Sequence, residues 1–528
     1  MESPLVSVVI PVHNAMPYLL KSLQSVVDQT IGIERLEVIA VDDGSTDGGG
    51  DVLDDFAKRY PTVFRVFHQE ASGTPSIPRN RALDIARGKY VFLLDADDYL
   101  GDEALERMVA MAEENDSDVV LGKLVGVNGR PVAMSMFQRD QPKADLYESR
   151  VYWALGPLKL YRRELLEQHA IRFPINRRTG EDRHFVALTF YHARTISVVA
   201  GYDCVYTVIR EDGGNLSQGG MRLPKDRTFN RDSQLRYMIE VIGDLVPEGP
   251  KQDFLMYRHW EVEGDVDLHH LLREATREDQ QAHLESLQEL VAKWYRPGSA
   301  HHLRPDLRLS YRLIEMGDLD GLLSLLTHRH QNGVPGTVSF VGRGDKVWAV
   351  LPGHEAEAGN GEGPWVDITD AVAINHWLDE VQAAGRSLQV RGTGRLKWVP
   401  HDRLTLHLEL HRRGTDERRR VAIEHENGIF TVDLDLDRLL GRMRRAVGDW
   451  DFTICVAIDE KEYRAPYGTR HGGPLVRKPI PKLLWRDARY PRRAFAALGA
   501  GKQGVLSLRV LDRSLKATAA KLVRRLRR

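Results

Sequence analysis

The sequence predicts an N-terminal α/β domain with a Rossmann-like, mostly parallel sheet, followed by a helical segment and a C-terminal β-sandwich. In residues 5–125, short apolar runs alternate with amphipathic stretches, a pattern typical of βαβ units. From about residue 226 apolar side chains recur at helical spacing, and beyond residue 336 the period changes to two. A chain of 528 residues is long enough for about two to four domains.

Four strands alternate with four helices in the first predicted domain. Each strand is an apolar run bounded by turn residues, and the first helix carries Leu19, Leu23 and Val27 on one face. We expect strands at residues 5–12, 36–41, 63–67 and 90–94, and helices at 15–29, 50–60, 78–86 and 102–114.

The helical segment contains a stripe formed by Leu284, Leu287, Val291 and Trp294, and Gly-Val-Pro-Gly at 333–336 is a plausible boundary after it. Short strands with turn residues between them then indicate a sandwich. These strands are expected at 337–341, 346–351, 404–410, 429–436 and 452–458. The expected domains are residues 1–225, 226–332, 333–475 and a basic tail at 476–528.

Composition narrows the class of protein. With 42% hydrophobic and 28% charged residues the chain is globular, and a net charge of −1 gives no case for a nucleic-acid binder. Cys204 and Cys455 are too few for a disulfide framework or a cysteine-rich zinc site, and they fit a reducing compartment. The N-terminus lacks a signal peptide and no apolar window is long enough to span a membrane, so we expect a cytoplasmic protein.

The most informative feature is the apolar run at 90–94 that ends in Asp95, Asp97 and Asp98. A strand buried on both faces would release these acids at the carboxyl edge of the sheet, where open α/β folds bind ligands. Mg²⁺ and Mn²⁺ favour carboxylates together with phosphate oxygens, so the acids predict a divalent cation that carries a diphosphate. A solvated acidic turn is the alternative for an Asp-x-Asp taken alone.

Two further predicted strands end in polar residues at the same edge. The first ends in Pro11-Val-His13-Asn, and the second ends in Asp42-Asp43-Gly-Ser-Thr-Asp. An Asp can accept a ring N–H of a base, and His13 can stack or hydrogen-bond. Each motif alone is also an ordinary helix-capping turn, but three such strand ends favour a shared nucleotide crevice.

Two helix starts complete the candidate site. Arg79 opens a helix, where the macrodipole disfavours a cation, so either an anionic ligand or a neighbouring acid should lie close to it. Glu181 and Asp182 open another helix, where acids also cap well. The functional interpretation makes Asp182 a general base that takes a proton from a hydroxyl nucleophile.

Together, in this order, the four clusters resemble the inverting family 2 glycosyltransferases of the GT-A fold over residues 5–220. The resemblance implies that a UDP-sugar is the donor, that Asp97 binds Mn²⁺ or Mg²⁺, and that Asp182 is the base with Glu181 beside the sugar or acceptor. The residues implied at the nucleotide-sugar site are Pro11, His13, Asp43, Arg79, Asp95, Ala96 and Arg210.

The order of domains is similar to that of the bacterial wall teichoic acid glycosyltransferases, which join a GT-A domain to a helical linker and Ig-like domains that drive trimerisation. This resemblance implies a polyol-phosphate or related anionic polymer as acceptor. Arg177, Arg178 and Arg183 are candidate basic contacts for that polymer, and solvated surface arginines are the alternative.

The last sixteen residues, 513–528, contain seven Lys or Arg residues and no acid, with Leu515, Ala519, Leu522 and Leu526 on one helical stripe. This pattern favours peripheral contact with an anionic membrane at the inner face of the cell, and a helix packed on the β domain is the alternative.

Three other functions fit part of the sequence: a transferase for capsular or exopolysaccharide glycans, a glycan-binding scaffold without catalysis, and a nucleotidyltransferase. The paired acids at 95 and 97 and at 181 and 182 argue against a scaffold. A nucleotidyltransferase has less need of an acceptor base such as Asp182.

Overall fold

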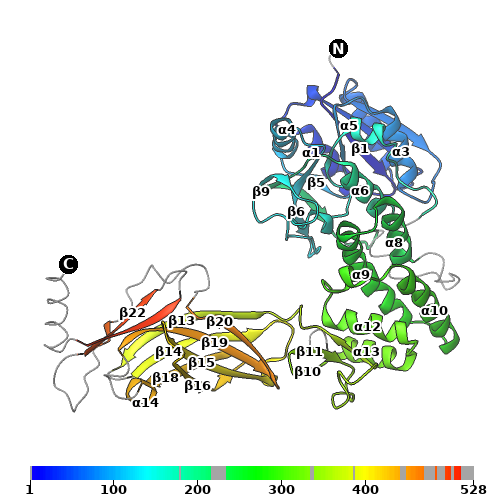
Figure 1. Ribbon diagram of the computed structural model, residues 1–528. Coiled ribbons are helices and arrows are strands. Elements are labelled where there is room, and N and C mark those ends of the chain that lie inside the picture. The colour runs from blue at the N-terminus through cyan, green and yellow to red at the C-terminus, as the bar shows by residue number, and fades with distance from the viewer. Residues whose placement is uncertain are drawn as a thin grey trace. The chain divides into compact units, whose positions relative to one another are not determined.

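A computed structural model describes residues 3–177, 180–215, 233–332, 338–384, 387–440, 447–468, 482–483, 494–500 and 505–512 (Figure 1). The chain divides into two compact units, Met1–Asp267 and Leu268–Arg528. The first contains the α/β domain and the start of the helical region. The second contains the remaining helices and the β-sheets.

The α/β unit is built on one mixed sheet. Its described strands have the order β3-β2-β1-β4-β8-β6-β9-β5, with β7 also paired to β9. The pairs β1–β2, β2–β3, β1–β4 and β6–β9 are parallel, whereas β4–β8, β6–β8, β5–β9 and β7–β9 are antiparallel. The bounds are β1 Val6–Val12, β2 Leu36–Asp43, β3 Phe64–Gln69, β4 Tyr90–Leu93, β5 Tyr99–Leu100, β6 Val119–Val127, β7 Gln141–Ala144, β8 Leu160–Arg162 and β9 Ile196–Val208.

The prediction of a mostly parallel sheet is therefore confirmed for β1 to β4, whereas the sheet as a whole is mixed, with β6–β9 as a further parallel pair. A parallel pair needs a crossover connection, and helices supply it between β1, β2, β3 and β4. Beyond β4 the chain enters β8 from the opposite direction, so β8 pairs antiparallel with both β4 and β6.

Helices cover both faces of this sheet. The four predicted helices are confirmed, each within a few residues of its expected bounds. Leu19, Leu53 and Met108, from three helices, share one apolar core with alternate residues of β1. The bounds are α1 Tyr18–Val27, α2 Gly49–Arg59, α3 Ser76–Ile85, α4 Ala104–Asn115, α5 Arg163–Gln168 and α6 Glu181–His192.

The register of the sheet brings three chain segments to one edge. Val12 at the end of β1 lies beside Asp42 of β2, and Val9 lies beside Leu93 of β4. The residues that follow these parallel strands therefore leave the sheet together, which is the condition for a shared site.

The helical region is confirmed. Leu284, Leu287 and Val291 of the predicted stripe are buried, and Trp294 at its end is half-buried. The helices are α8 Gln234–Leu245, α9 Pro250–Leu272, α10 Arg277–Trp294, α11 Pro297–Ala300, α12 Pro305–Met316 and α13 Leu319–Asn332. Within the described ranges, no helix is both long and apolar enough to cross a membrane.

The C-terminal strands form antiparallel sheets with the described orders β10-β11-β12, β13-β14-β18-β17 and β16-β15-β19-β23-β22-β21, with β20 also paired to β19. Their bounds are β10 Ser339–Arg343, β11 Lys346–Val350, β12 Trp365–Asp367, β13 Ile374–Ala384, β14 Ser387–Leu396, β15 Leu404–Arg412, β16 Arg418–Ile423, β17 His425–Glu426, β18 Ile429–Asp435, β19 Gly448–Ile458, β20 Lys461–Pro466, β21 Lys482–Leu483, β22 Ala494–Ala500 and β23 Leu506–Asp512.

The long hairpin of β13 and β14 was not predicted from the sequence, because β14 contains Gly392 and Gly394, which weaken a strand pattern. A Cβ at Gly392 would lie 1.7 Å from the hydroxyl of Tyr467, so packing requires the glycine. The predicted basic helix at 513–528 lies outside the described residues.

Candidate functional site

The ends of β1 and β2 form the first part of the site. Nδ1 of His13 donates to the carbonyl oxygen of Asp43 over 2.7 Å, which joins the two strand ends directly. The Asp43 carboxylate is buried and accepts from Nε2 of Gln69, from the backbone N–H of Ser72 and from the Ser72 hydroxyl, over 2.7, 3.0 and 2.8 Å. Pro11, half-buried, lies two residues before His13 in β1. Sequence reasoning missed Gln69 and Ser72, which carry no motif of their own.

The acids after β4 form the second part of the site. Burial, together with the charge of Asp95, raises the pKa of Asp97 to about 6. Burial and the charges of its two neighbours also raise the pKa of Asp98 well above its ordinary value. Oδ1 of Asp98 accepts from the backbone N–H of Val208 over 2.8 Å, while its Oδ2 is buried without a hydrogen-bond partner. Ala96 is buried between the acids. The cluster thus has more negative charge than the nearby cations neutralise.

Arg79 links these acids to the start of α6. Its Nη2 donates to Asp95 over 2.7 Å and its Nη1 donates to Glu181 over 3.2 Å. The guanidinium is 5% exposed, and the nearby carboxylates, including Asp182, raise its pKa although burial lowers it. The cation that the sequence left unexplained at a helix start is therefore paired with two acids, and it brings segments 102 positions apart into one site.

The acidic pair begins α6 immediately after Gly180, whose φ of 79° is the left-handed conformation that glycine favours. Both Glu181 and Asp182 lie in the first turn, where the helix dipole stabilises negative charge. Burial and the neighbouring Asp182 nevertheless raise the pKa of Glu181 to about 7. Glu181 can therefore carry a proton near neutral pH, which a carboxyl group needs in order to donate a hydrogen bond.

Arg210 lies on the loop after β9. Its Nη2 donates to the carbonyl oxygen of Asn14 over 2.9 Å, and the guanidinium also pairs with Asp212 over 2.7 Å. Asp212 holds the Arg210 pKa above its ordinary value, and Asp97 contributes to that rise. The structure thus brings the end of β1, the acids and this loop together, as the motifs predict.

The arginines expected to contact an acceptor lie differently from one another. Arg183 pairs with the buried Glu263 of α9 over 3.1 Å, so it links α6 to the helical region. Arg177 lies over the ring of Tyr237 at 3.9 Å, and Arg178 lies outside the described residues.

Sequence reasoning assigned no role to one lysine that the fold buries. Lys159 is 3% exposed and donates to the carbonyl oxygen of Gly156. Burial lowers the pKa of its ammonium to about 7, although Asp182 acts in the opposite direction. An apolar sequence context gives no signal that a lysine will be buried.

The acid cluster fits a divalent cation bound with a diphosphate. In the described part of the chain, no group of three or more His, Cys, Asp or Glu side chains has the geometry of an all-protein metal site. Mg²⁺-type sites often use only one or two carboxylates and complete their shell with phosphate oxygens and water. The unpartnered buried oxygen of Asp98 and the raised pKa of Asp97 are consistent with a missing positive charge at this edge.

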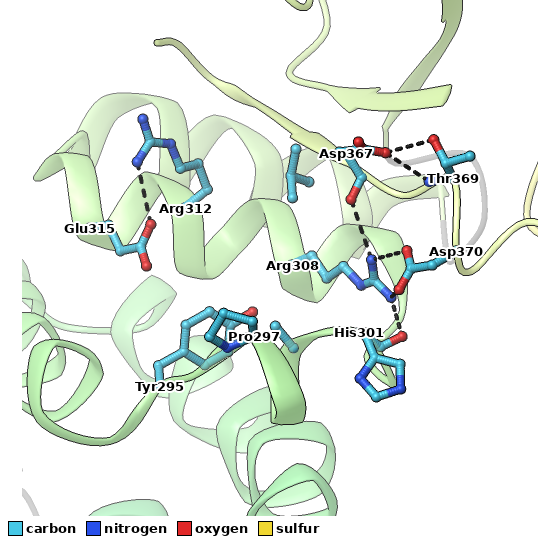
Figure 2. A pocket seen from close by; sticks show the side chains of 11 residues that line it. Tyr295, Pro297, His301, Arg308, Arg312, Glu315, Asp367, Thr369 and Asp370 are labelled. Atoms are coloured by element: carbon cyan, nitrogen blue, oxygen red, sulfur yellow. Dashed lines mark hydrogen bonds and ion pairs between the residues drawn. The ribbon is translucent and has the colours of Figure 1, made fainter. Parts of the chain in front are cut away.

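A separate cavity of about 630 Å³ lies within the second unit, between α11, α12 and β12 (Figure 2). Arg308 at its wall is satisfied by the Asp370 carboxylate at 2.7 and 3.1 Å and by the carbonyl oxygens of His301, Leu303 and Asp367. None of the motif residues lines this cavity.

The chain matches two described families, "Glycosyl transferase family 2" over residues 7–177 and "Glycosyl transferase TarS linker domain" over residues 232–326. It is 30% identical over 482 residues to a poly(ribitol-phosphate) beta-glucosyltransferase of Bacillus spizizenii, covering 88% of this chain and 72% of the relative. It is 36% identical over 250 residues to the poly(ribitol-phosphate) beta-N-acetylglucosaminyltransferase TarS of Staphylococcus aureus, covering 46% of this chain and 43% of TarS.

Solved structures agree with the sequence comparison. A crystal structure of S. aureus TarS shares the fold with a TM-score of 0.68 at 22% identity, covering 97% of this chain and 86% of that one. TarS 1-349 in complex with UDP-GlcNAc gives a TM-score of 0.56 at 26% identity, covering 66% of this chain and 98% of that one. The chain belongs to glycosyltransferase family 2, where it is related to the wall teichoic acid glycosyltransferases.

Proposed function

We propose that the protein transfers a sugar from a UDP-sugar to a hydroxyl of a poly(ribitol-phosphate) or similar teichoic acid, with inversion at the anomeric carbon. The observation that supports this most is the Arg79 bridge, because it joins Asp95 at the donor edge to Glu181 beside the proposed base. The names of the relatives at 30% and 36% identity support the same donor and acceptor classes.

In the proposed donor site, Pro11, His13 and Asp43 hold the uracil, and Asp95, Ala96, Arg79 and Arg210 lie along the ribose, diphosphate and sugar. Asp97 holds the cation. Mn²⁺ or Mg²⁺ bound there supplies Lewis-acid stabilisation of the diphosphate leaving group. Arg210 adds a fixed positive charge on the same side, since Asp97 contributes to its raised pKa.

The chemical step is a single displacement. The acceptor oxygen forms a bond to the anomeric carbon while the bond from that carbon to the diphosphate oxygen breaks, and UDP leaves with the electron pair. Asp182 takes the proton from the acceptor hydroxyl. Glu181, with a pKa of about 7, is positioned by Arg79 and is suited to donate a hydrogen bond to a sugar or acceptor oxygen.

The acceptor is a polyanion in this proposal, and Arg177 is the described arginine that remains a candidate contact near the base. Arg178 has the same proposed role but lies outside the described residues. The tail at 513–528 is proposed to bind an anionic membrane surface at the cytoplasmic face, where a lipid-linked polymer would be found.

We further propose that residues 1–225 are the GT-A catalytic domain, 226–332 the linker, 333–475 an Ig-like sandwich and 476–528 the tail. Gly394 of β14 supports the sandwich, because a Cβ there would lie 3.1 Å from Leu406 and 3.3 Å from Val456 in the other sheet. Trimerisation through the C-terminal sheets is part of the same proposal.

The test is UDP release from a panel of UDP-sugars with Mn²⁺, with and without purified poly(ribitol-phosphate), in the parent protein and in Asp182→Asn. One sugar should give polymer-stimulated UDP release in the parent, and Asp182→Asn should lose about 10²–10⁴-fold in rate while UDP binding changes little. The proposed acceptor would be excluded if the protein binds the donor and other glycans stimulate UDP release but poly(ribitol-phosphate) does not. Equal loss of binding and transfer in Asp182→Asn would remove its role as base.

A further inference from the structure

Asn215, to which no role was assigned above, contacts the acid cluster directly. Its Nδ2 donates to Oδ2 of Asp97 over 2.9 Å and to the carbonyl oxygen of Val208 over 3.0 Å. Its Oδ1 accepts from the backbone N–H of Arg210 over 2.7 Å. The side chain is 6% exposed, so both N–H groups and the carbonyl oxygen are used within the protein.

The local sequence folds the loop back so that Asn215 reaches this position. Gly213 has a φ of 70°, and its N–H donates to the carbonyl oxygen of Arg210 over 3.2 Å. A Cβ at Gly214 would lie 2.7 Å from Cζ of Arg210, so a side chain there would displace the guanidinium. The Gly-Gly pair therefore lets the chain turn tightly around Arg210 and return to the end of β9.

The same loop is also fixed beside the end of β1 and the start of α1. Arg210 donates to the carbonyl oxygen of Asn14, and the N–H of Glu211 donates to the hydroxyl of Tyr18 over 2.9 Å. Contacts at both ends hold the loop in place, so the Asn215 carboxamide can restrain the side chain of Asp97.

We propose that Asn215 is a positioning residue that holds the Asp97 carboxylate in one orientation for the cation and diphosphate of the donor. The hydrogen bond to Oδ2 restricts rotation of the Asp97 carboxylate before the ligands bind. Less conformational entropy of that side chain is therefore lost on binding. A carboxamide is suited to this place because it donates a hydrogen bond without adding a further negative charge beside Asp95, Asp97 and Asp98. The inference rests on the proposed function, since it assumes that Asp97 is the residue that holds the cation.

The test is UDP binding by calorimetry across a Mn²⁺ titration, using the full chain. In Asn215→Ala the Mn²⁺ concentration needed for half-maximal UDP binding should rise by about 10- to 100-fold, while UDP binding in EDTA stays as in the parent. Asn215→Asp keeps the shape of the side chain but replaces the N–H donor with a further carboxylate, so its Mn²⁺ titration at pH 8 should also differ from that of the parent.

Two control variants separate positioning from general damage. Asn128→Gly removes a carboxamide that donates to the carbonyl oxygen of Ile209 over 2.9 Å, beside the same loop but without contact to Asp97. Its φ of 57° suits glycine, and its Mn²⁺ titration should match the parent. Gln69→Ala removes a carboxamide that donates to Asp43, so it should weaken UDP binding equally with and without Mn²⁺.

The outcomes are distinguishable. A parent-like Mn²⁺ titration in both Asn215 variants would overturn the positioning role and leave the proposed function intact. Equal weakening of UDP binding in EDTA and in Mn²⁺ would also overturn it, because the effect would then be on the loop and not on Asp97. If the parent itself binds no UDP at any Mn²⁺ concentration, the proposed function fails and the inference fails with it.

Discussion

At the scale of single residues, Arg79 is shared between two acids that have different proposed roles. Asp95 follows β4 and Glu181 begins α6, and one buried guanidinium pairs with both. Because a single cation cannot fully neutralise Asp95, Glu181 and Asp182, burial and the charge of Asp182 still raise the pKa of Glu181. The site is therefore electrostatically strained at alkaline pH.

This strain makes stability depend on pH. A carboxyl group whose pKa rises from 4.5 to about 7 on folding favours the folded state at low pH and loses that contribution as pH rises through the interval. We expect Glu181→Gln to remove this loss of stability with rising pH. The free energy of unfolding of the variant minus that of the parent should therefore increase from pH 5 to pH 8. Urea unfolding at several pH values measures the difference. A constant difference across that range would show that Glu181 ionises normally in the folded protein.

At the scale of elements, helix α1 illustrates how an apolar face anchors the sheet. Leu23 is fully buried in the core shared with β1, whereas Leu20 on the same helix is 46% exposed. We expect Leu23→Ala to lower the free energy of unfolding by about 2–5 kcal/mol, because it leaves a cavity under the sheet.

Leu20→Ala is the matched control and should change stability by less than about 0.5 kcal/mol. Urea unfolding midpoints compare the two variants, and UDP affinity per folded molecule should be the same in both. Equal destabilisation by the two substitutions would contradict the assignment of Leu23 to the core.

Elements with strong periodicity were predictable, and contacts between distant segments were not. The apolar runs of β1, β2 and β4 identify strands, and the polar residues at their ends indicate the edge that carries the candidate site. The contacts of Gln69 and Asn215 with buried acids depend on how loops fold back, which no local pattern encodes. The antiparallel entry of β8 depends on the path of the chain after β5, which composition leaves open.

At the scale of the whole molecule, the family match of residues 7–177 and the linker match of residues 232–326 fall before the C-terminal sheets. We expect a fragment of residues 1–332 to bind UDP with Mn²⁺ as tightly as the full chain. Its particle mass in light scattering should correspond to fewer subunits, because the C-terminal sheets are proposed to carry the trimer contacts. The same number of subunits in fragment and full chain would contradict that proposal.

The contact between Arg210 and Asn14 has a consequence for synthesis on the ribosome. The two residues are 196 positions apart, and at about 5–20 residues per second their translation is separated by about 10–40 s. During that time β1, β2 and β4 can pair, but the acids at their edge lack their contacts with β9 and with the loop that follows it. We therefore expect the nascent chain to carry an incomplete candidate site until residue 215 has left the exit tunnel.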